Sequence, residues 1–330
     1  MTWQKRDDMG LEIVGKIHDT LKVPEQWRQD IDRGFKWWPE SFCQKIWAEN
    51  SNFSNAQSFF RVHAETELFK GKANRAEFEL SLATEMAHAT TSALVYDAER
   101  EVYSLHTSAY FTRENEEWLT RAFIGGCALQ LSEAFMLGKG FAQRIKAVNS
   151  VSGHPIHGLR DQADPILGAM QAWFIPHGAA ESRWTGINEW KQTEWAMDRQ
   201  ANHFESDHHT HLKAQFPWFL DQAASIDLYV TTDEPHPVIG NGLHQRMTIP
   251  LKMPPERCAN TAMQLNGMEA KDWLRCHTMG SWSFEDGQLE YESFVPNTLY
   301  QEGILENMTL SMAIRAQWVN DQFSAWFNAH

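Results

Sequence analysis

The chain has 330 residues, of which 42% are hydrophobic and 22% are charged, and this composition excludes an intrinsically disordered protein. A formal net charge of -14 argues against general binding to nucleic acids or anionic membranes, because both attract basic surfaces. The length accommodates two domains, each with its own hydrophobic core.

The four cysteines are far apart and show no C-x-x-C spacing, so neither a zinc ribbon nor a thioredoxin-like redox motif is expected. The first residues lack the apolar run of a signal peptide, and no later segment is apolar enough to cross a bilayer. The sequence therefore predicts a cytoplasmic protein without a cofactor.

In chain order, the first half begins with apolar residues at helical spacing, which predict a helix over 8–33 that Pro24 breaks or restarts. Three strands are expected next, at 34–39, 41–49 (with a helix as the alternative) and 57–69. The remaining elements are a helix, a two-stranded hairpin and a long helix, at 74–91, 93–96, 102–106 and 114–148.

Residues 151–186 contain many Gly, Pro and His residues and lack a clear period, so we interpret them as a linker that docks on the domains, with one helix at 161–173. The second half then repeats the order of the first. Its expected elements are a helix, three strands and a helix, at 187–201, 203–216, 224–232, 243–251 and 254–270.

The end of the chain, 280–323, repeats the pattern of 92–135: a strand, an acidic turn, a second strand, a loop and a long helix. The last helix carries an apolar stripe at spacings of three and four residues, formed by Leu305, Met308, Met312, Ala316, Val319, Phe323 and Trp326. We expect this stripe to pack on the helix's own sheet.

Both halves therefore have the order α-β-β-β-α-β-β-α. This order predicts an α+β fold of two tandem domains, at 1–150 and 187–330. Short links between neighbouring strands indicate antiparallel sheets, each with helices on one face. The other face would then be open for contacts.

This order of elements resembles the type III secretion chaperone-like superfamily, and within it the YbjN-type proteins. In the second half, the resemblance rests on His236-Pro-Val-Ile-Gly-Asn-Gly-Leu243, Met247-Thr-Ile-Pro-Leu251, Ala262-Met-Gln-Leu-Asn-Gly-Met-Glu269 and Phe294-Val-Pro-Asn297. The first half matches less closely, through Gly34-Phe-Lys-Trp-Trp-Pro39 and Leu82-Ala-Thr-Glu-Met86.

The resemblance implies a non-enzymatic protein that binds another polypeptide, as a chaperone or as an adaptor or regulator. Chaperones of this superfamily are acidic dimers that hold extended polypeptide in apolar grooves. Two copies in one chain would form an internal pseudo-dimer, with the chain monomeric; a homodimer is the alternative.

Five residues are candidates for a binding site: Trp37, Trp38, His154, Arg160 and His236. The two histidines begin the two His-Pro-x-x-Gly sequences, which are typical of tight turns, and Arg160 follows the first of them. The adjacent tryptophans would point to opposite faces of a strand, one into the core and the other either packed as well or exposed to a partner.

The run from His203 to His211 suggests a metal site, because His209 and His211 would share one face of a strand. No third ligand at a defined spacing is visible. The spacing E-x-x-H occurs in Glu85-Met-Ala-His88 and Glu205-Ser-Asp-His208, but a di-iron bundle would need two more Glu-bearing helices.

The alternative function is therefore a metal-dependent or small-ligand-binding enzyme that uses the His-rich strand and the His-Pro-x-x-Gly turns. No nucleophile elbow, P-loop, H-E-x-x-H or dinucleotide motif supports a particular reaction.

Overall fold

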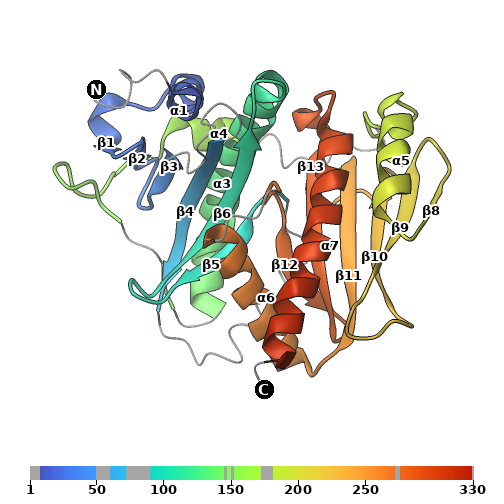
Figure 1. The fold of residues 1–330 in the computed structure, drawn as a ribbon. Helices are drawn as coiled ribbons and strands as arrows, with labels where there is room; N and C mark the ends of the chain where they lie inside the picture. Colours follow the sequence, from blue (N-terminus) through green and yellow to red (C-terminus); the bar gives the residue numbers. More distant parts are fainter. Residues whose placement is uncertain are drawn as a thin grey trace.

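A computed structural model describes residues 8–49, 60–71, 90–144, 147–149, 152–171, 181–271 and 276–328. All strand pairs are antiparallel and form two sheets that are accompanied by helices, so the predicted α+β class is confirmed. The two sheets lie side by side in Figure 1, the first in blue to green and the second in yellow to red.

The first sheet has the strand order β1-β2-β3-β4-β6-β5, with the short β7 beside β4. Its strands are β1 (Arg28–Ile31), β2 (Gly34–Trp37), β3 (Gln44–Ala48), β4 (Phe60–Lys70), β5 (Ala93–Asp97), β6 (Val102–Phe111) and β7 (Val148–Asn149). The helices α1 (Met9–Leu21) and α3 (Glu116–Arg144) pack together and on this sheet.

The second sheet has the strand order β12-β13-β11-β10-β9-β8. Its strands are β8 (His203–Ser206), β9 (His211–Pro217), β10 (Ser225–Thr231), β11 (Gly242–Lys252), β12 (Ser281–Glu285) and β13 (Gln288–Pro296). Its helices are α5 (Glu189–Gln200), α6 (Pro255–Lys271) and α7 (Ile304–Asn328). Counted along the chain within each sheet, both sheets have the same order, 1-2-3-4-6-5.

Each sheet has four strands before its final hairpin, and not the three that were predicted. The predicted first helix was too long: it ends at Lys22, which adopts the left-handed conformation at φ 52°, and residues 28–31 form β1. The predicted strand 203–216 was also wrong, because Asp207 interrupts it. The Asp207 carboxylate accepts the backbone N–H groups of His209, Thr210 and His211, which forms a turn between β8 and β9.

The described parts of the predicted linker dock on both sheets. Asp164 N–H donates to the carbonyl of Pro39 beside the first sheet, and Ser182 Oγ donates to the carbonyl of Gly242 in β11. The predicted linker helix is present as α4 (Pro165–Gln171), which packs against α3. The predicted long helix 114–148 is shorter than expected, since Val148 and Asn149 pair with β4. The predicted helix 74–91 lies almost wholly outside the described residues.

The apolar stripe of α7 is confirmed as a core-facing stripe. Its residues from Leu305 to Phe323 are buried, and α7 packs on β9, β10 and β11. Such a face of i, i+3 and i+4 residues is what a helix needs to cover a sheet. In Figure 1, α7 lies in front of the second sheet.

The two sheets are joined by reciprocal backbone hydrogen bonds. Ser108 of β6 and Thr278 each donate their N–H to the carbonyl of the other, at 3.1 and 2.9 Å. Phe294 of β13 donates its N–H to Thr90 O at 3.0 Å. One continuous cluster of buried apolar residues extends through both halves.

The first sheet has helices on both faces, whereas helices on one face only were expected. Arg61 and Val62 alternate along β4, so their side chains point to opposite faces. Val62 belongs to the core, whereas Arg61 donates to the backbone carbonyl of Glu269 in α6. The helix α6 lies against both β12 and β5, so part of the face that was expected to be open is covered.

Among the described residues, no helix combines the length and the apolar composition that crossing a membrane requires.

Candidate functional site

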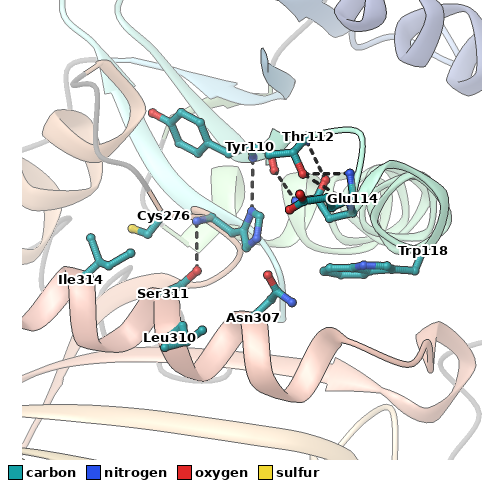
Figure 2. A pocket seen from close by; sticks show the side chains of 11 residues that line it. Tyr110, Thr112, Glu114, Trp118, Cys276, Asn307, Leu310, Ser311 and Ile314 are labelled. Carbon is teal, nitrogen blue, oxygen red and sulfur yellow. Dashed lines mark hydrogen bonds between the residues drawn. The ribbon is translucent and has the colours of Figure 1, made fainter. Parts of the chain in front are cut away.

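A groove of about 370 Å³ lies at the junction of the two halves, where the connection from β6 to α3 faces α7 (Figure 2). This volume is within the range that ligand-binding sites usually have. One wall comes from the first half and the other from the second, and the segment Cys276–His277 also lines it.

The wall from α7 is built by a second stripe on that helix. Asn307, Leu310, Ser311 and Ile314 are three or four residues apart and line the groove. Figure 2 shows Asn307, Ser311 and Ile314 projecting from α7 toward the segments that carry Tyr110 and Cys276. One face of α7 therefore packs on the sheet, while another is available in the groove.

The opposite wall is held rigidly by side-chain hydrogen bonds before α3. Thr112 N–H donates to Asn115 Oδ1 at 2.8 Å, and Asn115 N–H donates to Thr112 Oγ1 at 3.3 Å. Asn115 Nδ2 also donates to the carbonyl of Tyr110 at 3.0 Å. This reciprocal arrangement is that of a helix N-terminal capping motif. Trp118, in the first turn of α3, covers Gly303, whose added Cβ would lie 3.1 Å from the indole.

His277 is a buried polar side chain of the groove, with 6% of its surface exposed. Its Nδ1 accepts the backbone N–H of Tyr110 at 3.2 Å, so the neutral ring carries its proton on Nε2. Burial, and secondarily the charge of Arg315, lowers the pKa of His277 to about 4. The ring is therefore neutral near pH 7.

The neighbouring Cys276 is buried, and burial raises the pKa of its thiol to about 12. A thiol with such a pKa stays protonated near neutral pH, and it is a poor nucleophile in that form. Near pH 7 the groove therefore contains a protonated thiol and a neutral imidazole.

The equivalent position on the other side of the junction, where the connection from β13 to α7 faces α3, has no open groove among the described residues because a side chain occupies it. There the connection after β13 contains a short 3-10 turn, η4 (Asn297–Leu299), which packs against α3. The Leu299 side chain is buried and lies against Gly125, where an added Cβ would be 2.0 Å from Leu299 Cδ2. The groove is thus open on one side of the junction and closed by a leucine on the other.

Of the residues proposed from the sequence, three meet at the docked segment. Trp38 Nε1 donates to Ser152 Oγ at 3.0 Å, and its indole ring lies edge-on to His154 at 4.9 Å. Arg160 donates to the carbonyl of Trp38 at 2.9 Å and forms an ion pair with Asp164 at 2.9 Å. These contacts fasten residues 152–164 to the first sheet.

Trp37 and Trp38 are both buried, at 0% and 4% exposure. Trp37 Nε1 donates to Gln44 Oε1 at 3.0 Å inside the core. Neither indole therefore presents an exposed surface to a partner in this structure.

The two His-Pro-x-x-Gly sequences form the same turn. In the first, His154 Nδ1 accepts the N–H groups of Ile156 and His157, both at 3.2 Å. In the second, His236 Nδ1 accepts those of Val238 and Ile239, also at 3.2 Å. The imidazoles cap the turns, and His236, which packs on Phe294, lies in the other half from Trp38, His154 and Arg160.

His209 and His211 do not share a strand face, which corrects the geometry expected for the metal site. His209 lies in the turn that Asp207 forms, and His211 Nδ1 is 3.1 Å from Asp207 Oδ2. His208 Nδ1 lies 2.8 Å from Glu194. The part of the chain that the structure describes contains no group of three or more His, Cys, Asp or Glu residues placed to hold a metal ion.

Only one of the two E-x-x-H sequences, Glu205-Ser-Asp-His208, lies in the described residues. Glu205 is on β8, and His208 is in the turn that follows, with a positive φ of 67°. Glu85 and His88 lie outside the described residues.

The groove residues were not among those proposed from the sequence. One signal was present: Asn307, Leu310, Ser311 and Ile314 form a second, mixed stripe beside the apolar stripe of α7. That stripe alone does not indicate which segment faces it. His277 lies in an aperiodic stretch, where no local pattern distinguishes it.

Comparison of the chain with protein-family models, curated proteins and solved structures finds no match.

Proposed function

We propose that the chain is a non-enzymatic binding protein that holds a short segment of another polypeptide in the junction groove. The observation that carries this proposal is the second face of α7. Leu310 and Ile314 supply apolar surface there, Asn307 and Ser311 supply polar atoms, and the face lies within a preformed groove. Amphipathic walls of this kind suit polypeptide segments.

The chemistry of the groove favours binding over catalysis. The thiol of Cys276 stays protonated and the imidazole of His277 stays neutral near pH 7, because burial raises the first pKa and lowers the second. A chaperone-like or adaptor role also agrees with the resemblance to the type III secretion chaperone-like superfamily.

We further propose that the two halves are tandem copies of one domain that form an internal pseudo-dimer. The common strand order supports this, and so does the reciprocal bonding at the junction. The Ser108–Thr278 bridge and the Phe294–Thr90 bond connect equivalent places of the two halves in opposite directions. Light scattering at micromolar concentration is expected to give the mass of one chain; a stable dimer would contradict the pseudo-dimer.

Selection from a phage-displayed peptide library on the immobilised chain tests the binding function. Enriched peptides are expected to bind the wild type and to lose about tenfold or more in affinity for Ile314→Lys, because the lysine charge would be covered by the bound segment. Ile314 is 40% exposed, so this variant is expected to fold.

Phe327→Lys is the matched control, since Phe327 is also an exposed apolar residue of α7, at 57%, and does not line the groove. Peptides should bind this variant as they bind the wild type. A library that yields no enriched peptide, or peptides that bind both variants equally well, would overturn the proposal.

A further inference from the structure

The polar atoms of the groove show what kind of group it accepts. No described residue forms a hydrogen bond with Nε2 of His277, although the residue is more than nine-tenths buried and lines the groove. Since Nδ1 is occupied by the N–H of Tyr110, Nε2 is left as a neutral donor. The Nε2–H group is open to the groove, where a ligand or water can accept its hydrogen.

Asn307 supplies the complementary atom. Its Nδ2 donates to the carbonyl of Gly303 at 2.9 Å, which fixes the orientation of the amide group. Its Oδ1 then remains as a neutral acceptor, and no described residue donates to it. Nε2 of His277 and Oδ1 of Asn307 thus add an uncharged donor and an uncharged acceptor to the groove.

These two groove atoms are complementary to an uncharged ligand group that can both accept and donate a hydrogen bond. A backbone amide is such a group, because its C=O accepts and its N–H donates. A carboxylate would satisfy His277 but leave Asn307 Oδ1 facing another acceptor, and an ammonium group would do the reverse. The pair therefore favours an amide over either ion.

The rim of the groove adds one charge. Glu114 is exposed and lines the groove, and its carboxylate forms no ion pair with a described residue. Its backbone N–H donates to Thr112 Oγ1 at 3.3 Å, so the residue is held at the start of α3. With a net charge of -14 on the chain as a whole, the rim attracts a cation.

We infer that the groove binds an extended peptide whose backbone offers a C=O to His277 Nε2–H and an N–H to Asn307 Oδ1, and that a Lys or Arg near this contact lies beside Glu114. This inference rests on the proposed polypeptide-binding function and names the chemistry of the partner segment. The apolar side chain of the segment would contact Trp118, Leu310 and Ile314.

A backbone-ester scan of a peptide selected on the wild type tests the amide contact. Replacing one amide by an ester removes its N–H and weakens the acceptor strength of its carbonyl. One position is expected to lose about 3- to 10-fold in affinity for the wild type, measured by fluorescence polarisation. With the Asn307→Ala variant, the same ester substitution should reduce the affinity less, because the protein no longer has the acceptor for the peptide N–H.

His277→Asn tests the donor without disturbing its support. The Asn oxygen can accept the N–H of Tyr110 as Nδ1 does, but no donor remains at the position of Nε2. Affinity for the unmodified peptide is expected to fall about 3- to 10-fold. Circular dichroism and the unfolding midpoint show whether the variant is folded.

Glu114→Gln tests the cation preference, with Glu117→Gln as its control. Glu117 is exposed in the first turn of α3, three residues after Glu114, and does not line the groove. In a positional-scanning library, the preference for Lys or Arg is expected to fall about 2- to 5-fold in Glu114→Gln and to persist in Glu117→Gln.

The outcomes separate the two proposals. If no peptide binds, the proposed function is wrong. If peptides bind but the ester scan is flat, or the preference for basic residues survives Glu114→Gln, polypeptide binding stands and this inference is overturned.

Discussion

Glu269 of α6 and Arg315 of α7 form a two-point ion pair in which Nε lies 2.8 Å from Oε1 and Nη2 lies 3.0 Å from Oε2, with side-chain exposures of 4% and 0%. Trp282 Nε1 donates to the same carboxylate at 2.7 Å, and Arg315 Nη2 donates to the carbonyl of His277 at 2.9 Å. The pair thus connects α6, α7, β12 and the residue that lines the groove.

Removing one member of this pair is expected to destabilise the protein strongly. Glu269→Gln leaves the Arg315 charge buried without compensation, which costs about 3–5 kcal/mol. Urea unfolding measures the change. Arg121→Met is the control, because Arg121 pairs with Glu117 at side-chain exposures of 65% and 89% and such a pair contributes about 0–1 kcal/mol. Equal effects of the two variants would contradict the role assigned to the buried pair.

Two glycines of α3 are expected to respond in opposite ways to alanine. Gly125→Ala places a methyl group against Leu299 and should cost about 1–3 kcal/mol through overpacking. Gly140 has no atom within 4 Å of an added Cβ, so Gly140→Ala should stabilise the protein by about 0.5–1 kcal/mol. Thermal or urea unfolding distinguishes them.

The double variant Gly125→Ala/Leu299→Ala identifies the cause. If Leu299 is the obstacle, the cost of Gly125→Ala should become smaller in the Leu299→Ala background. An unchanged cost would show that the packing of Leu299 on Gly125 does not determine stability.

Stability is also expected to depend on the ionisation of Glu133. This residue is 8% exposed and accepts a hydrogen bond from Thr90 Oγ1, and burial raises its pKa to about 7 from 4.5. The folded protein therefore keeps a proton that the unfolded chain releases. The contribution of protonated Glu133 to the stability of the folded protein is fully present below pH 4.5 and is lost as the pH rises through about 7.

Glu133→Gln removes this ionisation. At pH 8 the variant is expected to be more stable than the wild type by about 3 kcal/mol, and near pH 4.5 the two should be similar. Urea titrations at both pH values measure the difference. A constant difference between the two proteins at pH 4.5 and pH 8 would refute the raised pKa.

The His-rich turn is not expected to depend on a metal. His208 and His211 are each bonded to a separate carboxylate, of Glu194 and Asp207. Dialysis against a chelator should leave the melting temperature unchanged, and added zinc should not raise it. A zinc-dependent increase that disappears in His208→Ala would instead establish a metal site.

Much of the fold follows from local sequence patterns, because burial of one face imposes a period. The stripe of α7 and the turn between β12 and β13 were predictable for that reason. The strand β1 was not, because its sequence Arg28-Gln-Asp-Ile has no apolar alternation and two of its residues are exposed. It pairs with β2 after α1 has ended at Leu21, where Lys22 is the C-cap.

The groove could not be predicted in the same way. It brings Tyr110 and Trp118 together with His277, which is more than 150 residues away along the chain. Local periodicity contains no information about such a contact. For Trp38, His154 and Arg160 the sequence did indicate residues of interest, because their types and turn motifs are unusual. It did not indicate whether their contacts stabilise the fold or bind a ligand.

The contact of Leu299 with Gly125 has a consequence for stoichiometry. A symmetric homodimer has every surface twice, so a ligand that fits one copy fits the other. Here a leucine closes one of the two corresponding places, and the other place remains open. A partner that uses the open groove would therefore bind once per chain. If the two halves are copies of one domain, as proposed, the chain differs from a homodimer of identical subunits in that only one of the two equivalent places is open.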